Sequence, residues 1–452
     1  MPILKSGDPS NVKNYRPVVI LNTLSKVFES LVLDKLSFEF KNYIIPEQHG
    51  FRARKSTTTH LAVFHDFIQA AFSRGHQVDC IFTDFSKAFD RVSHPHLLAK
   101  IESMGITGTL LQWFTSYLSE RPLSVRFRSA ISTPSIAISG VPQGSHLGPF
   151  LFNLFINDIG QHLTINYLLF ADDLKLFVEV KDGQDQTRLQ HNIDIISNWC
   201  KVNSMDLNPE KCKSITFCRS QQTTIFHYKV DGVALERVSE IKDLGVVTSS
   251  TLHQGSHIHK ICSKANSALG FISRVSRECL TLPTMKLLYM TLVRSQLEYN
   301  STIWSPYQQG LISQIERVQT RFIRLLGVRR GFRYLEVPVE ELRVELGLFT
   351  LQERRELLDL QFLYKIINGL VDSAELLERV PFHVPRTTSV RRHETFGRQQ
   401  FRTSYHFNST LPRLLRLGNA ASEQVDFFSS SLRTFNSQSK SFIETHGYQP
   451  SS

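Results

Sequence analysis

The stretch from Tyr167 to Phe177 constrains the fold of this chain most, because it places two adjacent carboxylates between two apolar runs. Short apolar runs rich in aromatic residues are typical of strands, so the pattern predicts a hairpin with Asp172 and Asp173 at its tip. Burying two unpaired carboxylates would cost roughly several kcal/mol each. Oxygen ligands suit Mg²⁺, so the hairpin tip is a candidate half of a metal site, and a polar turn is the alternative.

Two further segments stand upstream of the hairpin. An apolar strand, Cys80 to Phe82, leads to Asp84, and a loop with the sequence Ser–Gly–Val–Pro–Gln–Gly–Ser spans residues 139–145. The loop glycines allow a tight turn with close approach of the backbone to a ligand. The three segments, in this order and spacing, resemble the polymerase motifs of reverse transcriptases. Among reverse transcriptases they are most similar to those of non-LTR (LINE-type) retrotransposons of the jockey-like group. The resemblance implies that Asp84, Asp172 and Asp173 are the catalytic, metal-binding carboxylates.

The resemblance also implies a nucleotide site and its chemistry. A primer 3′-hydroxyl would attack the α-phosphate of a dNTP on an RNA template, with two Mg²⁺ ions roughly 3.5–4 Å apart and Mn²⁺ as the alternative cation. Phe89 would lie beneath the sugar and exclude a 2′-hydroxyl, although an ordinary core role is the competing interpretation. Lys211 would lie near the departing pyrophosphate, and a solvated turn lysine is equally consistent with the pattern. The residues expected to bind the dNTP are Arg16, Phe85, Phe89, Gln143, Gly144 and Lys211.

Basic residues predict contacts with nucleic acid. The net charge is +11 and the pI is about 9.3, which favours a polyanionic partner. Phosphate contacts require only positive charge and hydrogen-bond donors, and a solvated charge run is the alternative for each cluster. The segment from Ile241 to Val247 is similar to a primer grip, with Asp243 where a tyrosine is usual. The residues expected to contact template or primer are Arg52, Arg54, Lys55, Leu244, Gly245, Lys260 and Lys264.

The pattern and the resemblance together predict an α+β, right-hand polymerase fold with an antiparallel palm sheet. We expect fingers over residues 1–76, a palm with further fingers elements over 77–250, a helical thumb over 251–330, and a mainly helical, basic region over 331–452. Apolar spacing predicts helices near residues 24–36, 61–72, 147–156, 258–271, 312–326 and 348–367. Strands are expected at Val125–Phe127 and Ile136–Ile138, paired with each other.

The sequence lacks the features of membrane and secreted proteins. No apolar run reaches transmembrane length, and the first residues lack the apolar core of a signal peptide. Six cysteines without Cys-x-x-Cys spacing indicate reduced thiols. These observations predict an intracellular protein of the nucleus or cytoplasm, with no membrane partner and no small-molecule cofactor. Typical relatives carry an endonuclease domain before the polymerase. This chain opens almost at the expected fingers, so we expect it to lack that domain.

Three functions compete. The first is an RNA-directed DNA polymerase whose partners are an RNA template, a DNA primer and dNTPs. The second is a catalytically inactive, retrotransposon-derived fragment that binds nucleic acid. The third is an RNA-templated RNA polymerase, which shares the aspartate motifs, although Phe89 and the loop at residues 139–145 argue against it.

Overall fold

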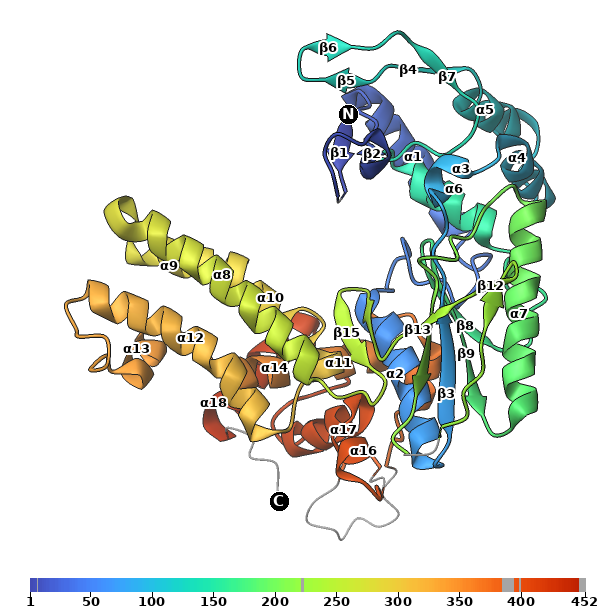
Figure 1. The fold of residues 1–452 in the computed structure, drawn as a ribbon. Coiled ribbons are helices and arrows are strands. Elements are labelled where there is room, and N and C mark those ends of the chain that lie inside the picture. The colour runs from blue at the N-terminus through green and yellow to red at the C-terminus, as the bar shows by residue number, and fades with distance from the viewer. Residues whose placement is uncertain (6, 221–222, 384–393, 398–399, 447–452) are drawn as a thin grey trace. The chain divides into compact units, whose positions relative to one another are not determined.

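The computed structural model describes residues 1–5, 7–220, 223–383, 394–397 and 400–446 (Figure 1). The chain forms two compact units. Unit 1 comprises Met1–Ala53, Val78–Thr216 and Gln222–Val238, and unit 2 comprises Arg54–Gln77, Phe217–Gln221 and Ser239–Ser452.

A five-stranded sheet with the order β13-β10-β3-β9-β8 is the framework of unit 1. Its strands are β3 (Gln77–Phe82), β8 (Asn166–Phe170), β9 (Asp173–Val180), β10 (Lys213–Phe217) and β13 (Glu236–Arg237). β8 and β9 form the expected antiparallel hairpin. The short edge strand β13 pairs in parallel with β10, so the expected antiparallel sheet carries one parallel pair at its edge.

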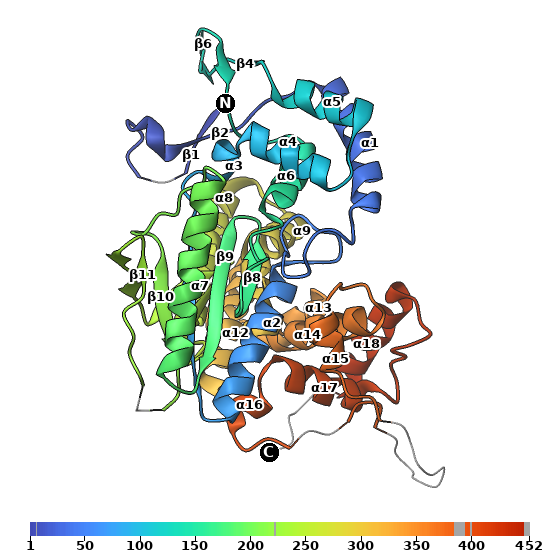
Figure 2. The same ribbon diagram turned by 90° about the vertical axis from the view of Figure 1, so that its right-hand side faces the viewer.

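Helices cover this sheet and extend unit 1. Helix α7 (Gly183–Val202) runs along the sheet, and its N-terminus is fixed by a capping box between Asp182 and Asp185 (Figure 1). Helix α6 (Leu147–Ile156) is buried along its whole length except Pro149, as its apolar sequence predicts. Figure 2 shows α6 beside the other helices of this part of unit 1. These are α1 (Thr23–Glu39), α3 (Ala88–Arg91), α4 (His94–Ser103) and α5 (Gly108–Leu118).

Helix α1 forms where expected, and Leu36 joins the core of unit 1 with Val32 packed against it, but the rest of the apolar stripe stays exposed. Leu24 is 82% exposed, Leu31 65% and Phe38 67%. The helix is therefore amphipathic in sequence while much of its apolar face meets solvent.

The expected pairing of Val125–Phe127 with Ile136–Ile138 is wrong. Instead β4 (Arg121–Leu123) pairs with β7 (Ser135–Ala137), and inside that pair β5 (Arg126–Phe127) pairs with β6 (Ala130–Ile131). The left-handed conformation of Arg128 allows the chain to reverse directly after β5, so β5 pairs with the next segment. The other short pairs are β1 (Pro2–Leu4) with β2 (Tyr15–Pro17), and β11 (Lys229–Val230) with β12 (Val233–Ala234).

Unit 2 consists of helices with one short hairpin. Helices α8 (Gly255–Cys279) and α12 (Gln309–Arg329) lie side by side (Figure 1). Helix α14 (Leu351–Ile367) starts at a capping box of Thr350 and Glu353 and packs against two C-terminal helices, α17 (Thr410–Ala421) and α18 (Leu432–His446). The remaining helices and strands are α2 (Thr57–Ser73), β14 (Glu240–Asp243), β15 (Val246–Ser249), α9 (Leu282–Leu288), η2 (Tyr289–Arg294), α10 (Ser295–Glu298), α11 (Ser301–Trp304), α13 (Val339–Glu345), α15 (Ala374–Glu378) and α16 (Ser404–Phe407).

The expected α+β class with a helical C-terminal region is confirmed. The compact units group α2 with the C-terminal helices, whereas the sequence assigns α2 to the fingers. The division into fingers, palm, thumb and C-terminal region stays a prediction. Among the residues that the structure describes, no helix has the length and apolar character needed to cross a membrane.

Candidate active site

Two neighbouring strands of the sheet in unit 1 position Asp84 and Asp172. Asp84 follows β3, and Asp172 lies in the two-residue turn between β8 and β9. The backbone N–H of Thr83 donates to the carbonyl of Leu174 at 3.0 Å, which ties the end of β3 to the start of β9. The sheet order places β3 beside β9, so both carboxylates stand at one end of adjacent strands.

The two carboxylates are placed so that the charge of Asp84 affects the ionisation of Asp172. Burial raises the pKa of Asp172 above its ordinary value, and the negative charge of Asp84 raises it further. Two effects lower the pKa of Asp172: a hydrogen bond from its own backbone, and the positive charges of Lys5 and Arg16. The Lys211 ammonium lies 3.4 Å from Oδ2 of Asp84. Three cationic side chains therefore lie near the aspartate pair, and two of them, Arg16 and Lys211, are predicted dNTP ligands.

Asp173 is placed differently from the other two aspartates. It is the first residue of β9, pairs with Phe170 across the hairpin, and is exposed. Within the described part of the chain, no cluster of three or more ligating side chains is arranged to hold a metal ion. Asp84 and Asp172 nevertheless fit a hard divalent cation, because a cation between two neighbouring carboxylates relieves their mutual repulsion. The assignments of Asp84, Asp172 and Asp173 as metal ligands all stay predictions.

The loop that contains Gln48, Gly50 and Arg52 supports the turn at Asp172. In the sequence, only the basic residues of this loop indicated a function. Ala171, the first turn residue, has a left-handed backbone with φ of 57°. The side chain of Gln48, only 1% exposed, forms two hydrogen bonds with the backbone of Ala171. A Cβ on Gly50 would lie 2.2 Å from the Ala171 nitrogen, so the loop can approach this closely only with glycine at this position. The glycine in Gln–His–Gly–Phe–Arg was the sequence signal for this contact.

The predicted sugar-contacting side of the site is built from aromatic rings and the loop at residues 139–145. The Phe89 ring stacks on Phe152, with centroids 4.3 Å apart and planes 15° apart, and meets the edge of Phe51. Gln143 Nε2 donates to Oδ1 of Asp90 at 2.8 Å. Burial raises the pKa of Asp90, and the hydrogen bond from Gln143 partly offsets this. Asp90 thus holds the Gln143 side chain, a role that the sequence did not indicate.

Other predicted residues of unit 1 have structural contacts. Phe85 is 5% exposed and forms a bridge with Leu207. A Cβ on Gly144 would lie 2.9 Å from the Val19 carbonyl oxygen, and its φ is 105°, so both space and conformation require glycine. Arg52 Nη1 donates to the Ile45 carbonyl at 2.7 Å, which commits part of this guanidinium to its own loop.

The remaining predicted nucleic-acid contacts belong to unit 2. Arg54 Nη1 donates to the carbonyl of Gly369 at 3.4 Å, and Lys55 precedes α2. Leu244 and Gly245 form the turn between β14 and β15, and Tyr299 Oη donates to the Leu244 carbonyl at 3.0 Å. Lys260 and Lys264 are both exposed on α8.

A groove between α8 and α12 adds positive charge near these lysines. Its lining includes Arg274 from α8 and Arg317 and Arg321 from α12. Arg321 Nη1 donates to Oδ1 of Asn266 at 2.8 Å, which holds one guanidinium in the groove. The sequence analysis did not single out these two α12 arginines, because the groove arises only when the two helices pack.

Comparison with known proteins now identifies the class. The profile of the reverse transcriptase (RNA-dependent DNA polymerase) family matches residues 3–248, more than half of the chain. The chain therefore belongs to the reverse transcriptase family. The matched segment contains Asp84, Asp172, Asp173 and the Gln143 loop.

The relatives are transposon polymerases of insects. A probable RNA-directed DNA polymerase from transposon X-element of Drosophila melanogaster is 30% identical over 335 residues, covering 72% of this chain and 37% of the relative. The corresponding protein from transposon BS is 28% identical over 340 residues, with coverage of 72% and 37%. The polymerase from mobile element jockey of Drosophila funebris is 28% identical over 336 residues, with coverage of 71% and 36%. The expected kinship with jockey-like non-LTR retrotransposon polymerases is confirmed, and the chain spans about a third of these relatives.

Among solved structures, apo telomerase from Candida tropicalis matches 79% of this chain and 60% of its own chain. That match has 11% identity and a TM-score of 0.39.

Proposed function

We propose that this chain catalyses RNA-directed DNA synthesis, adding deoxynucleotides to a primer 3′-hydroxyl on an RNA template. The observation that carries the proposal is the pairing of Asp84 with Asp172 at the ends of adjacent strands, inside the segment that matches the reverse transcriptase family. Neighbouring, partly buried carboxylates repel each other, and a cation between them relieves this repulsion, so the arrangement suits a site that binds cations.

Asp84 and Asp172 are the residues that would hold Mg²⁺ or Mn²⁺, with Asp173 as the third proposed ligand. When bound, two such ions would activate the primer hydroxyl and stabilise the leaving pyrophosphate. Lys211, 3.4 Å from Asp84, would neutralise charge on the departing pyrophosphate. Arg16 would bind the triphosphate, because a guanidinium pairs with two phosphate oxygens at once. Phe89 and Gln143 would orient the sugar.

Nucleic acid would contact basic surfaces of both units. In unit 1 the proposed contact is Arg52, and in unit 2 they are Arg54, Lys55, Lys260, Lys264 and the turn at Leu244–Gly245. The α8–α12 groove supports this proposal, because its arginines suit a phosphate backbone.

Primer extension on poly(rA)/oligo(dT) with Mg²⁺ tests the proposal. We expect incorporation of dTTP by the wild-type chain. Asp84→Asn and Asp172→Asn are each expected to lower the rate by about 10²-fold or more, since each removes one preorganised charge. Asp194→Asn, which changes an exposed carboxylate on α7, is the matched control and should extend normally.

Affinity for the primer–template should change little in either active-site variant. A folded wild-type chain that binds primer–template but does not extend it would favour the inactive nucleic-acid-binding fragment. Preferential use of ribonucleotides would favour an RNA polymerase.

A further inference from the structure

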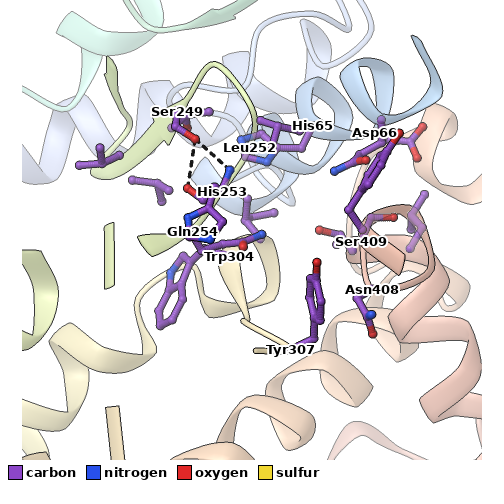
Figure 3. A pocket seen from close by; sticks show the side chains of 18 of the residues that line it. His65, Asp66, Ser249, Leu252, His253, Gln254, Trp304, Tyr307, Asn408 and Ser409 are labelled. Atoms are coloured by element: carbon purple, nitrogen blue, oxygen red, sulfur yellow. Dashed lines mark hydrogen bonds between the residues drawn. The ribbon is translucent and has the colours of Figure 1, made fainter. Parts of the chain in front are cut away.

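A cavity in unit 2 lies partly beside the segment similar to a primer grip, because Val246 and Val247 are among its lining residues (Figure 3). Its volume is about 70 Å³, several times the roughly 10–15 Å³ that one water molecule requires. The walls come from α2, β15 and the loop after it, α11, and the segment around α16 and α17. In Figure 3, Tyr307 and Ser409 stand across an open space from His253 and Gln254.

Three polar atoms in the walls have no hydrogen-bond partner among the described residues. They are Oε1 of Gln69, Oγ1 of Thr248 and Oε1 of Gln308. Gln69 is 9% exposed and Thr248 only 3%. Buried polar groups are almost always paired in folded proteins, so each of these atoms calls for a hydrogen-bond partner, which either water or a ligand can supply. The two amides and the hydroxyl together suit a ligand whose edge carries both N–H and carbonyl groups.

Aromatic and charged side chains narrow the class of ligand. Tyr307 and Tyr405 both line the cavity, and Tyr307 is 39% exposed overall. The guanidinium of Arg219 lies over the Tyr405 ring, 3.9 Å from its centroid. Asp66 places a carboxylate in the wall, 3.6 Å from Nε of Arg379. A carboxylate disfavours a phosphate inside the cavity, whereas Arg219 at the exposed side can meet one outside.

We propose that this cavity binds one unpaired nucleobase of a single-stranded nucleic acid. Such bases are typically stacked on aromatic rings or arginine planes and hydrogen-bonded along their edges by amides and hydroxyls. The base enters between Tyr307 and the polar wall, and its phosphate remains near Arg219. The inference uses the proposed polymerase function only as the reason why single strands are present, and it is tested by binding rather than by extension.

The test measures fluorescence anisotropy of a short, labelled, single-stranded RNA of mixed sequence with the full chain. Tyr307→Ala removes the exposed ring, and the double variant Gln69→Leu/Thr248→Val removes two polar wall groups. Each is expected to raise the Kd for single-stranded RNA by about tenfold, the scale of losing one base contact. Tyr334→Ala, which removes a 48% exposed tyrosine of the same unit outside the cavity, is the matched control and should leave the Kd unchanged.

The same RNA annealed to its complement separates base recognition from phosphate contacts. Its Kd should be the same for wild type and Tyr307→Ala, because a paired base cannot enter. A DNA strand of the same sequence shows the source of recognition. Equal losses for RNA and DNA mean that the base alone is bound, and a loss for RNA only means that the ribose is bound as well.

Two results would overturn the proposal. One is an unchanged Kd of Tyr307→Ala for single-stranded RNA, in a variant whose circular dichroism matches that of the wild type. This result would mean that the cavity holds only water. The other is an equal loss for duplex and single strand. Because Tyr307 is partly exposed, its variant decides the question even if the double variant fails to fold.

Discussion

Gln48 and Ala171 are joined by two hydrogen bonds that span 123 residues of sequence. Oε1 of Gln48 accepts from the Ala171 N–H at 2.9 Å, and Nε2 donates to the Ala171 carbonyl at 3.2 Å. The same Oε1 accepts from the Gly50 N–H at 2.7 Å. An alanine with left-handed φ is unfavourable by roughly 1–2 kcal/mol, so these bonds stabilise the conformation that presents Asp172.

We therefore expect Gln48 to act as a positioning residue. Gln48→Leu leaves buried backbone groups unpaired, which costs roughly 1–3 kcal/mol for each group. If Asp172 shifts, kcat should fall by about 10- to 10²-fold, because small displacements of reacting groups have effects of this size. The Mg²⁺ concentration at half-maximal rate should rise, while the affinity for primer–template stays the same. Steady-state extension kinetics at varied Mg²⁺ measure both quantities.

The control for Gln48 is Gln190→Leu on α7, where the side chain donates to the exposed Lys229 carbonyl at 2.9 Å. It should leave kcat and the Mg²⁺ dependence unchanged. A Gln48→Leu protein that is less stable but has wild-type kcat and Mg²⁺ dependence would limit Gln48 to a structural role.

Phe89 is expected to set the choice of sugar. Its stacking on Phe152 at 4.3 Å holds the ring rigidly, which a steric filter requires. Phe89→Ala should increase use of rUTP relative to dTTP opposite rA by about tenfold or more. Single-nucleotide incorporation measures this ratio, and the melting temperature is recorded in parallel.

Phe89→Tyr keeps the ring and should retain the preference for dTTP. If Phe89 were only a core residue, Phe89→Ala would lower stability by roughly 3–5 kcal/mol. An active, folded Phe89→Ala enzyme with the wild-type ratio would rule out the steric filter.

Lys260 and Lys264 are expected to contribute to nucleic-acid binding through charge alone. They are exposed and one helical turn apart on α8, so they can meet neighbouring phosphates. The double variant Lys260→Gln/Lys264→Gln should reduce the slope of log K against log salt by about 0.7–0.9 for each lost contact. Lys440→Gln, on exposed α18 surface, is the control. The prediction fails if the salt dependence of binding is the same in all three proteins.

His257 should make unit 2 sensitive to acid. It is 2% exposed, its Nδ1 accepts from the Val247 N–H at 3.1 Å, and burial, followed by the charge of Lys260, lowers its pKa to about 4. Between about pH 4 and 6.5 the unfolded state binds a proton that the folded state does not. The free energy of unfolding should therefore fall as the pH falls through this range, by up to about 3 kcal/mol.

Chemical denaturation across this pH range measures the effect of His257. His257→Asn should show a weaker pH dependence than wild type, whatever its stability at neutral pH. His191→Asn, on exposed α7, should keep the wild-type pH dependence. An unchanged pH dependence in His257→Asn would show that other groups cause the acid sensitivity.

Local patterns in the sequence determined much of this protein. The apolar runs around Asp172 are long enough to specify the β8–β9 hairpin, and the spacing of apolar residues specifies helices such as α6, α12 and α14. Order and spacing of the aspartate motifs were enough to identify the family, because these motifs depend on few residues held close in sequence. The roles of individual site residues remained open, since a motif does not reveal its partners.

Only the tertiary structure decided the contacts between distant segments. The bond from Gln48 to Ala171 joins a loop to a hairpin turn, and the bond from Gln143 to Asp90 joins a loop to the short helix α3. None of these short segments carries a periodic signal. The pairing of β5 with β6 depended on the backbone conformation at Arg128, and the exposure of Leu24 and Leu31 depended on which faces find a partner. Hydrogen bonds and packing between such segments form only after the chain folds, so their residues cannot be matched from spacing in the sequence.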